Sequence, residues 1–438
     1  MLKGKSVLIG VTGGIAAYKM AGVCSSLIKL HADVDVMMTE NACNFITPIT
    51  FESLTSSKCM VDTFDRNFQF DIRHISAAQK ADVLLIAPAT ANVIGKLANG
   101  IADDMLTTTA LACRCDKIIA PAMNTNMFVN PVVQDNIEKL KKYGWTVIPP
   151  ESGRLACGAI GTGKMPSEEV LISYILRSIA CNKDLSDKKV LVTAGPTCEA
   201  IDPVRYITNH STGKMGYAIA NRAMLRGADV TLITGKTQIQ PPPFVNVVPV
   251  VSAEEMYNAV MGNADSADII IMSAAVADYR PINVSDQKIK KSDSDMEIKL
   301  ERTKDILKEV CKHKRNGQFI CGFSMETENL IENSRKKLEK KNCDMIAANS
   351  LKCEGAGFGT DTNIITLITN DSINELPFMT KEQAADRILD AKQPDVLNVR
   401  FYLSFLIFLC NKLQINNNIY INIEKLYDRK YNVIVASY

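Results

Sequence analysis

Histidine is scarce in this sequence of 438 residues, and long apolar runs are absent. Only four histidines occur, which excludes a histidine-rich metal site: His31, His74, His210 and His313. The longest apolar run, near residues 401–410, is well short of the roughly 18–20 residues that a membrane-spanning helix needs. Neither sign of charge is in excess, because 50 Lys and Arg balance 48 Asp and Glu. A net charge of +2 argues against a large surface that follows nucleic-acid phosphates.

Apolar residues make up 47% of the chain, which is enough to bury substantial cores. The length is about three times the ~150 residues typical of one domain, so we expect two or three domains. The 13 cysteines are scattered and odd in number, and no secretion signal is visible. We therefore expect reduced thiols in a cytoplasmic protein, without a disulfide framework.

In the first half, short apolar runs alternate with helical patterns. The apolar runs predict strands at residues 6–11, 34–38, 83–87, 117–120 and 146–148. The helical patterns cover residues 15–30, 103–113, 131–143 and 167–179. Strands that alternate with helices are typical of βαβ units and of a parallel sheet that is covered on both faces. Residues 149–166 break the pattern with four glycines and three prolines and are predicted to be a mobile loop or flap.

The alternation restarts after a polar segment, residues 181–187, which we interpret as a linker. Strands are predicted at residues 189–193, 229–234, 269–273, 297–300, 319–323, 345–348 and 364–368, the last one antiparallel. Helices are predicted at residues 214–226, 253–263, 305–313, 330–340 and 381–389. The sequence thus predicts two doubly wound, Rossmann-like α/β domains at residues 1–180 and 188–390. The tail, residues 391–438, is rich in Asn, Ile, Tyr and Leu, and no function is assigned to it.

Several polar motifs in the first half follow predicted strands, at the edge where open α/β sheets bind ligands. A glycine turn at residues 10–15 could hold a phosphate at a helix N-terminus, or it could be only a tight turn. His74 could act as a base, although a lone histidine is more often a surface or a satisfied core residue. Asn124 follows the fourth strand. Cys157 lies among glycines with little core to join, which favours a reactive thiol over a buried one.

Taken together, these motifs resemble the flavin-dependent cysteine decarboxylases of the pantothenate pathway. The resemblance covers nearly all of residues 1–180 and rests on residues 11–19, 38–40, 74, 87–92, 121–124 and 156–158. It implies a flavodoxin-like domain with bound FMN, held by Gly13, Gly14, Thr39, Ala87 and Thr90. It also implies that the cysteine part of 4′-phosphopantothenoylcysteine is oxidised at Cβ, so that the sulfur can accept electrons as CO₂ leaves. By the same resemblance, His74 acts in the oxidative decarboxylation, Asn124 binds the substrate carboxylate, and Cys157 protonates the enethiol.

The second half carries a polar loop at residues 202–216 and a cationic cluster at residues 288–291. Taken alone, the loop could be an ordinary capped turn and the cluster a solvated charge run. With residues 193–197 and 274–279 they resemble phosphopantothenate–cysteine ligase over about residues 188–390. The order of the two halves matches the fused bacterial bifunctional enzyme of coenzyme A biosynthesis.

This second resemblance implies a reaction that uses CTP and Mg²⁺ and passes through an acyl cytidylate. Lys288 would stabilise charge during activation, and Asn209 would hold the acyl cytidylate for the amine. The family pattern assigns CTP contacts to Met272, Ser273, Ala274, Asp278, Lys288, Lys304, Asp305, Ile306, Leu307, Phe323, Lys337 and Lys341. Lys337 and Lys341 are spaced i, i+4, so they share one helix face. The metal ligands are not identified.

The sequence departs from the ligase pattern at residues 303–306 and 322–327. These departures motivate an alternative, in which a decarboxylase is fused to a ligase-like domain that has lost its activity. A third alternative is a binding or regulatory protein of the flavin fold, which has no need of His74, Asn124 and Cys157 together. The resemblance also implies small-molecule substrates and flavin sites between subunits of a homo-oligomer, a trimer-based dodecamer. From the charge balance and the short apolar runs, we expect no nucleic-acid or membrane partner.

Overall fold

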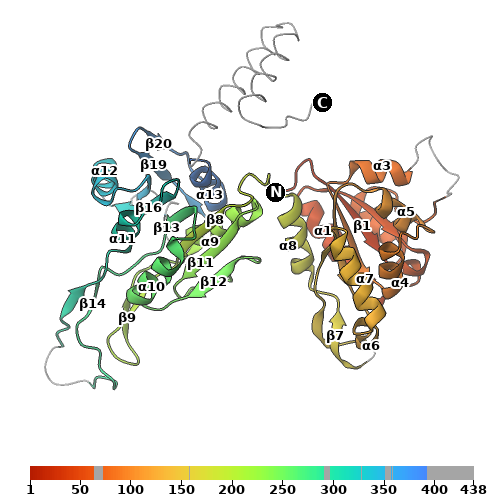
Figure 1. Cartoon of the computed structure of the whole chain (residues 1–438), viewed down its shortest axis with the longest axis horizontal. Helices are drawn as coiled ribbons and strands as arrows, with labels where there is room; N and C mark the ends of the chain where they lie inside the picture. Colours follow the sequence, from red (N-terminus) through yellow and green to blue (C-terminus); the bar gives the residue numbers. More distant parts are fainter. Residues whose placement is uncertain are drawn as a thin grey trace, which may run out of the picture. The chain divides into compact units, whose positions relative to one another are not determined.

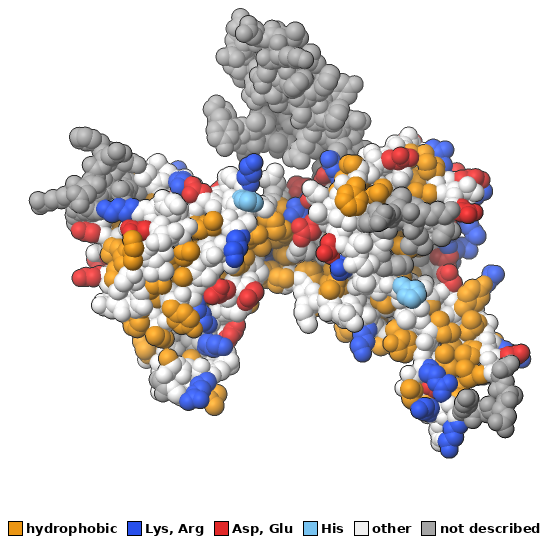
Figure 2. Space-filling view, turned by 180° about the vertical axis from the view of Figure 1, so that it is seen from behind, with side chains coloured by type: hydrophobic (Ala, Val, Ile, Leu, Met, Phe, Trp, Pro, Cys, Tyr) orange, Lys and Arg blue, Asp and Glu red, His pale blue; other side chains and the backbone are white. Residues whose placement is uncertain are grey.

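The computed structural model describes residues 1–63, 73–156, 158–290, 296–326, 328–350, 357 and 359–391, so that nearly all of the predicted tail lies outside the described residues. The chain divides into two compact units, each with its own central sheet (Figure 1). Among the described residues, no helix has the length and apolar character needed to cross a membrane. Acidic and basic side chains are interspersed over the face shown in Figure 2.

The first unit contains a five-stranded sheet. Its strands are β1 (Ser6–Val11), β2 (Asp33–Met38), β3 (Val83–Ala89), β4 (Asp116–Pro121) and β5 (Thr146–Val147). The strand order is β2-β1-β3-β4-β5, and every pair is parallel. This is the flavodoxin-like order, which confirms the predicted fold class for this half.

Helices cover both faces of this sheet (Figure 1). They are η1 (Ile15–Lys19), α1 (Met20–Lys29), η2 (Glu40–Asn44), α2 (Pro48–Thr55), α3 (Arg73–Lys80), α4 (Ala91–Ala98), α5 (Met105–Ala112), α6 (Thr125–Phe128), α7 (Pro131–Lys142) and α8 (Glu168–Ile179). The predicted helix at residues 15–30 is therefore divided into a 3₁₀ turn and an α-helix. Helices α2, α3, α4 and α6 and the short helix η2 were not predicted.

Alternation along the strands explains why both faces are apolar. Ile9 and Val11 pack with α1 and α8, whereas Leu8 packs with α4 and α5 on the opposite face. All residues of β1 and β3 are buried. Successive side chains of a strand point to opposite faces, so a sheet covered on both sides needs an unbroken apolar run.

The prediction that residues 149–166 form a loop is wrong in its local structure. The segment forms an antiparallel hairpin of β6 (Glu151–Arg154) and β7 (Ile160–Lys164). Glycine and proline lower the strand propensity of this segment, so its pairing is not visible in the local sequence. The hairpin is instead held by its contacts with the segment before α6, which are described below.

The second unit is organised around an eight-stranded sheet of order β12-β11-β8-β13-β16-β17-β19-β20. Its strands are β8 (Lys189–Ala194), β11 (Asp229–Thr234), β12 (Asn246–Pro249), β13 (Ile269–Met272), β16 (Phe319–Glu326), β17 (Met345–Ser350), β19 (Ile365–Thr369) and β20 (Ile373–Glu375). Strands β13, β16 and β17 are parallel, and β19 is antiparallel to β17, as predicted. The helices are α9 (Lys214–Leu225), α10 (Ala253–Ala264), α11 (Ile306–Lys312), α12 (Leu330–Lys341) and α13 (Lys381–Asp390).

Three small ribbons, which were not predicted, complete the second unit. They pair β9 (Cys198–Ala200) with β10 (Tyr206–Thr208), β14 (Tyr279–Pro281) with β15 (Leu300–Arg302), and β18 (Thr362–Asn363) with β21 (Met379–Thr380). The strand predicted at residues 297–300 thus begins at Leu300 and pairs outside the main sheet. These strands are two or three residues long, too short to give a recognisable alternation.

Candidate active sites

The first unit has a cavity of about 520 Å³ at the carboxyl ends of β1 and β3. Strand β2 lies on one side of β1 and β3 on the other, so the strand order reverses at this point. In open α/β sheets, ligands bind in the crevice at such a reversal. The cavity is lined by Gly13, Gly14, Ile15, Ala16, Tyr18, Lys19, Pro88, Thr90, Ala91, Ala122, Met123, Asn124, Met127, Arg154, Leu155, Ala156, Gly163, Lys164 and Met165.

Thr12, which is fully buried, joins the two strand ends at the base of this cavity. Its hydroxyl donates to the carbonyl oxygen of Pro88 at 2.6 Å and accepts from the N–H of Thr90 at 3.1 Å. The Thr90 hydroxyl in turn caps α4 by accepting from the N–H of Val93. Because these polar groups are satisfied within the protein, the glycine turn and the start of α4 have fixed positions beside the cavity.

The residues predicted to hold FMN divide into two groups. Gly13, Gly14 and Thr90 line the cavity. Thr39 does not: its hydroxyl caps η2 by accepting from the N–H of Ala42 at 3.3 Å. Ala87 is fully buried in the core beneath the strand ends. In this structure Thr39 and Ala87 lie in segments beside the cavity and are not part of its lining.

The three predicted catalytic residues of this half have different locations. Asn124 lines the cavity, and its side-chain oxygen accepts from the N–H of Asn126 at 2.8 Å as the cap of α6. His74 lies in the first turn of α3, is half-buried, and does not line the cavity. Cys157 lies outside the described residues. Its neighbours Leu155 and Ala156 line the cavity.

Two glycines of β7 let the β6–β7 hairpin approach the segment that carries Asn124. A Cβ at Gly161 would lie 2.4 Å from Oγ1 of Thr125. A Cβ at Gly163 would lie 2.2 Å from the carbonyl oxygen of Met123, and Gly163 has φ +141°. The carbonyl of Gly163 accepts from the N–H of Met123 at 3.0 Å. The hairpin and the Asn124 segment are therefore two walls of one cavity, in backbone contact.

Gly163→Ala is expected to reduce decarboxylation about tenfold, because the added methyl cannot coexist with the Met123 carbonyl and moves both walls apart. CO₂ release under saturating substrate measures the effect. Gly153→Ala on the neighbouring strand is the matched control, since a Cβ there meets only Cδ of Lys164 at 3.7 Å. Equal activity of the two variants would show that the backbone contact has no bearing on the reaction.

The second unit has a cavity of about 680 Å³ between the carboxyl ends of β13 and β16 and the helices α11 and α12. The structure brings together here all the residues predicted to contact CTP except Ser273 and Lys288. The cavity is lined by Met272, Ala274, Val276, Ala277, Asp278, Tyr279, Arg302, Thr303, Lys304, Asp305, Ile306, Leu307, Phe323, Lys336, Lys337, Lys340 and Lys341. Lysines from one face of α12 give this cavity a cationic wall, which suits an anionic ligand.

Three lysines that line this cavity are held in different ways. Nζ of Lys337 donates to the carbonyl of Phe323 at 2.7 Å, and burial lowers the pKa of Lys337 in spite of Glu326 and Asp278 nearby. Burial also lowers the pKa of Lys341, which is paired with Asp305, the N-cap of α11. Nζ of Lys304 lies 2.7 Å from Oε1 of Glu254 and over the ring of Tyr257. Among these three lysines, Lys337 is the one whose ammonium donates to a backbone carbonyl. It is half-buried, whereas Lys304 is exposed.

The two predicted catalytic residues of the ligase half lie outside this cavity. Asn209 is exposed, and its amide donates to the carbonyl of Ala275 at 3.0 Å. Lys288 is exposed on the segment that connects β14 and β15. Next to it, the N–H of Ile289 donates to the buried carboxylate of Asp202 at 3.2 Å. Burial raises the pKa of Asp202, but hydrogen bonds from three backbone N–H groups outweigh it and leave the pKa below its usual value.

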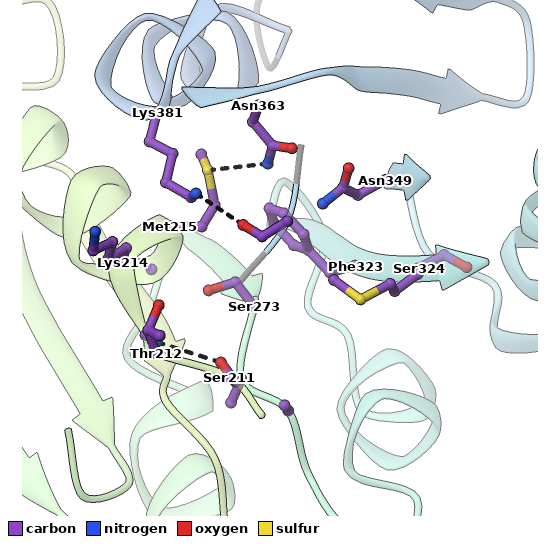
Figure 3. Close-up of a pocket in the computed structure, with 16 residues that line it drawn as sticks. Ser211, Thr212, Lys214, Met215, Ser273, Phe323, Ser324, Asn349, Asn363 and Lys381 are labelled. Carbon is purple, nitrogen blue, oxygen red and sulfur yellow. Dashed lines mark hydrogen bonds between the residues drawn. The ribbon is translucent and has the colours of Figure 1, made fainter. Parts of the chain in front are cut away.

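A smaller cavity of about 140 Å³ adjoins the 680 Å³ cavity of the second unit and shares Ala274 and Phe323 with it (Figure 3). It is lined by residues 211–216 at the start of α9, by Ser273, Ala274 and Ala275, by residues 323–325, and by Asn349, Gly357, Asn363 and Lys381. Asn349 is 5% exposed, and its side-chain oxygen has no hydrogen-bond partner among the described residues. A buried acceptor without a partner is costly, so this cavity is suited to a ligand that donates a hydrogen bond.

Sequence reasoning missed Asn349, Asn363 and Lys381. Asn349 lies near the carboxyl end of β17, where the general rule for ligand sites in α/β sheets could have indicated it. Gly216, in the motif that was recognised, lets α9 approach the sheet: a Cβ there would lie 2.6 Å from Cβ of Ala194 and from Oγ of Ser273. Asn363 and Lys381 are distant in sequence and carry no local signal.

Comparison with known proteins gives two family models that match in sequence. The flavoprotein family matches residues 1–180, and the C-terminal domain of the DNA/pantothenate metabolism flavoprotein matches residues 185–393. Among solved structures, a crystal structure of the C-terminal domain of a coenzyme A biosynthesis bifunctional protein CoaBC has 43% identity. It covers 50% of this chain and 100% of its own, with a TM-score of 0.42.

Two curated relatives match this chain over nearly their full length. The coenzyme A biosynthesis bifunctional protein CoaBC of Bacillus subtilis is 48% identical over 393 residues, which are 89% of this chain and 97% of that protein. The protein of the same name from Borreliella burgdorferi is 42% identical over 391 residues, 89% of this chain and 99% of its own length. Because these identities extend over nearly the full length of both relatives, the chain belongs to the family of coenzyme A biosynthesis bifunctional proteins.

Proposed function

We propose that this protein carries out two consecutive steps of coenzyme A biosynthesis. The C-terminal half ligates cysteine to 4′-phosphopantothenate with CTP, and the N-terminal half decarboxylates the 4′-phosphopantothenoylcysteine to 4′-phosphopantetheine. The observation that carries the proposal is that each half has its own cavity at the carboxyl edge of its own sheet. Four of the eight residues assigned to decarboxylation line the first cavity, namely Gly13, Gly14, Thr90 and Asn124. Ten of the thirteen residues assigned to ligation line the second cavity.

The cavity of the first half fits FMN. Apolar side chains such as Ile15, Met123 and Met165 offer surface for a flat ring system. The turn at Gly13 and Gly14 leads into η1, whose first N–H groups suit a phosphate, with Lys19 nearby in the lining. When bound, the flavin supplies a reversible hydride transfer, which lets a reaction without net redox change pass through an oxidised substrate.

The side chains of the chain itself orient the substrate and move protons. Asn124 would donate its amide N–H to the carboxylate that leaves as CO₂ and so hold it beside the cavity. Cys157, which follows cavity residues Leu155 and Ala156, would donate its proton to the enethiol. The β6–β7 hairpin would keep water from the intermediate, since it forms one wall of the cavity.

In the ligase half, the cationic wall would hold the phosphates of CTP. Lys337 and Lys341 would offset negative charge as the carboxylate of 4′-phosphopantothenate attacks the α-phosphate and pyrophosphate leaves. Lys341 would exchange its partner Asp305 for the nucleotide. Lys288 would add a charge from the β14–β15 segment, and Asn209 would hold the acyl cytidylate while the amine of cysteine displaces CMP.

We propose that Mg²⁺ enters together with CTP. In the described part of the chain, no group of three or more His, Cys, Asp or Glu side chains is placed to hold a metal ion. Mg²⁺ in nucleotide sites is commonly held by substrate phosphates, water and one or two carboxylates, so a preformed cluster is not required. Asp278 in the cavity lining is the acidic residue that this reading favours.

We also propose a homo-oligomer with shared flavin sites. His74 does not line the cavity of its own chain, although the resemblance gives it a role in decarboxylation. If a second copy of the chain contributed its His74 to the cavity, this position of His74 would agree with its role in decarboxylation. Sedimentation of the purified protein would measure the assembly, and an active monomer would contradict this arrangement.

Two measurements on the purified protein test the function. A yellow protein with the absorption of oxidised flavin is expected, and a colourless chain that takes up no FMN would contradict the decarboxylase. For the ligase, we expect pyrophosphate release that requires CTP and 4′-phosphopantothenate and that continues beyond one turnover only when cysteine is present. Flavin with no such release would favour the alternative of an inactive ligase-like domain, and flavin without either activity would favour the binding protein.

A further inference from the structure

Lys381, the first residue of α13, is a buried lysine whose charge serves no known step. Its side chain is 6% exposed, and it lines the smaller cavity of the ligase half. Its ammonium donates to the carbonyl of Gly357 at 3.1 Å, to that of Thr362 at 3.2 Å, and to that of Thr360. Among the described residues, no carboxylate lies within ion-pair distance of it. All three carbonyls belong to Gly357 and residues 359–363, which together we call the cavity wall.

A second lysine holds the same wall from the other side. Lys214, the first residue of α9, donates to the carbonyl of Gly359 at 2.8 Å and pairs with Asp361 at 2.7 Å. Asp361 is 88% exposed, so this ion pair contributes little to fixing the wall. The buried ammonium of Lys381 is different, because it has lost its water and depends on the three carbonyls for hydrogen bonds.

The cavity wall lines the same cavity as Asn349, a buried side chain with an unsatisfied hydrogen-bond acceptor among the described residues. It contributes Gly357 and Asn363, which is 2% exposed, to the lining of the cavity. The same lining includes Phe323 and Asn349, whose buried side-chain oxygen lacks a partner among the described residues (Figure 3). The position of the cavity wall therefore sets the width of the cavity where Asn349 would accept a hydrogen bond from substrate.

We propose that Lys381 is a positioning residue of the ligase: its ammonium fixes the cavity wall, and through it the shape of the cavity that holds substrate beside Asn349 and Phe323. Lys381 itself touches no reacting atom. Removing its hydrogen bonds frees the wall and weakens binding of the substrate in this cavity, while the chemical step in the adjoining cationic cavity continues.

The test rests on the proposed ligase function and uses the full-length protein. Lys381→Met keeps the length of the side chain and removes the donors. We expect the KM of CTP or of 4′-phosphopantothenate to rise about tenfold, which corresponds to about 1.4 kcal/mol. The kcat should stay within about threefold of the unchanged protein, the pattern of lost uniform binding. Lys308→Met, an exposed lysine of α11 outside both cavities, is the matched control and should change neither constant.

The outcomes separate the two proposals. If the protein without substitution has no ligase activity, the proposed function is contradicted. If that protein is active and Lys381→Met leaves both KM values unaltered, the proposed role of Lys381 is overturned. A lower melting temperature with both KM values unchanged would also overturn it. Should Lys381→Met not fold, amide hydrogen exchange on the unchanged protein decides. CTP or 4′-phosphopantothenate should slow exchange of residues 359–363, and no slowing with either would refute the proposal.

Discussion

Lys337→Met is expected to lower the kcat/KM of ligation about 100-fold, while CO₂ release from 4′-phosphopantothenoylcysteine stays unchanged. Lys337 is half-buried in the cationic wall, and its ammonium donates a hydrogen bond to the carbonyl of Phe323. Methionine fills the same space without charge, so the loss reports on electrostatic stabilisation of the phosphates. Pyrophosphate release at varied CTP measures the effect, and the decarboxylase half of the same preparation serves as an internal standard.

Lys312→Met is the control for this substitution, because Lys312 is 68% exposed and pairs with Glu309 away from the cavity. It should retain full ligation. Comparable losses in the two variants would mean that net charge, and not the position of Lys337, governs the reaction.

The lowered pKa of Lys337 adds a pH dependence with a definite sign. The ammonium loses its proton as pH rises, and it does so at a lower pH than an ordinary lysine. Binding of CTP should therefore weaken on the alkaline side. Lys337→Arg should move this weakening to higher pH, since a guanidinium keeps its proton throughout. The shift is partial, because burial also lowers the pKa of Lys341. An identical alkaline limb in the variant would exclude Lys337 as its origin.

Asn124→Ala is expected to lower the kcat/KM of decarboxylation roughly 10- to 100-fold, the range for a lost hydrogen bond to a charged group. Asn124 lies in the cavity lining at the end of β4, opposite the β6–β7 hairpin. Without its amide, the carboxylate of the substrate loses a donor in an apolar cavity. CO₂ release with varied substrate measures the effect, and ligation by the same protein should be unaffected.

Asn130→Ala controls for the loss of a helix cap. Asn130 caps α7 as Asn124 caps α6, with its side-chain oxygen 3.0 Å from the N–H of Val132, but it does not line the cavity. Its replacement should cost about 1 kcal/mol of stability and leave decarboxylation intact. If both variants lose activity to the same degree, the role of Asn124 is structural.

Much of the fold was predictable because buried strands and capped helices leave local signals. Strand β1 is a continuous apolar run, as a strand buried on both faces must be. Helix α8 begins at a Ser167 cap and carries acidic residues in its first turn. Where elements are two or three residues long or depend on distant partners, as in the β6–β7 hairpin, prediction failed because the stabilising contacts are not local.

The same distinction applies to the candidate sites: some of their features could be predicted from the sequence, and others depend on contacts between distant residues. The sequence indicated the chemistry through residue types at strand ends, such as Asn124, Asp278 and Phe323. It could not indicate that Thr39 caps a turn, that Lys341 is paired with Asp305, or that Lys381 holds the wall beside Asn349.

By itself the sequence determined that the protein has two α/β halves, with polar motifs where the strands end, since apolar periodicity and turn residues act over a few positions. Only the tertiary structure decided which of those motifs share a cavity. Strand order and helix packing bring together residues that are tens to more than a hundred positions apart, and their contacts follow from burial of the whole core, which no short segment specifies.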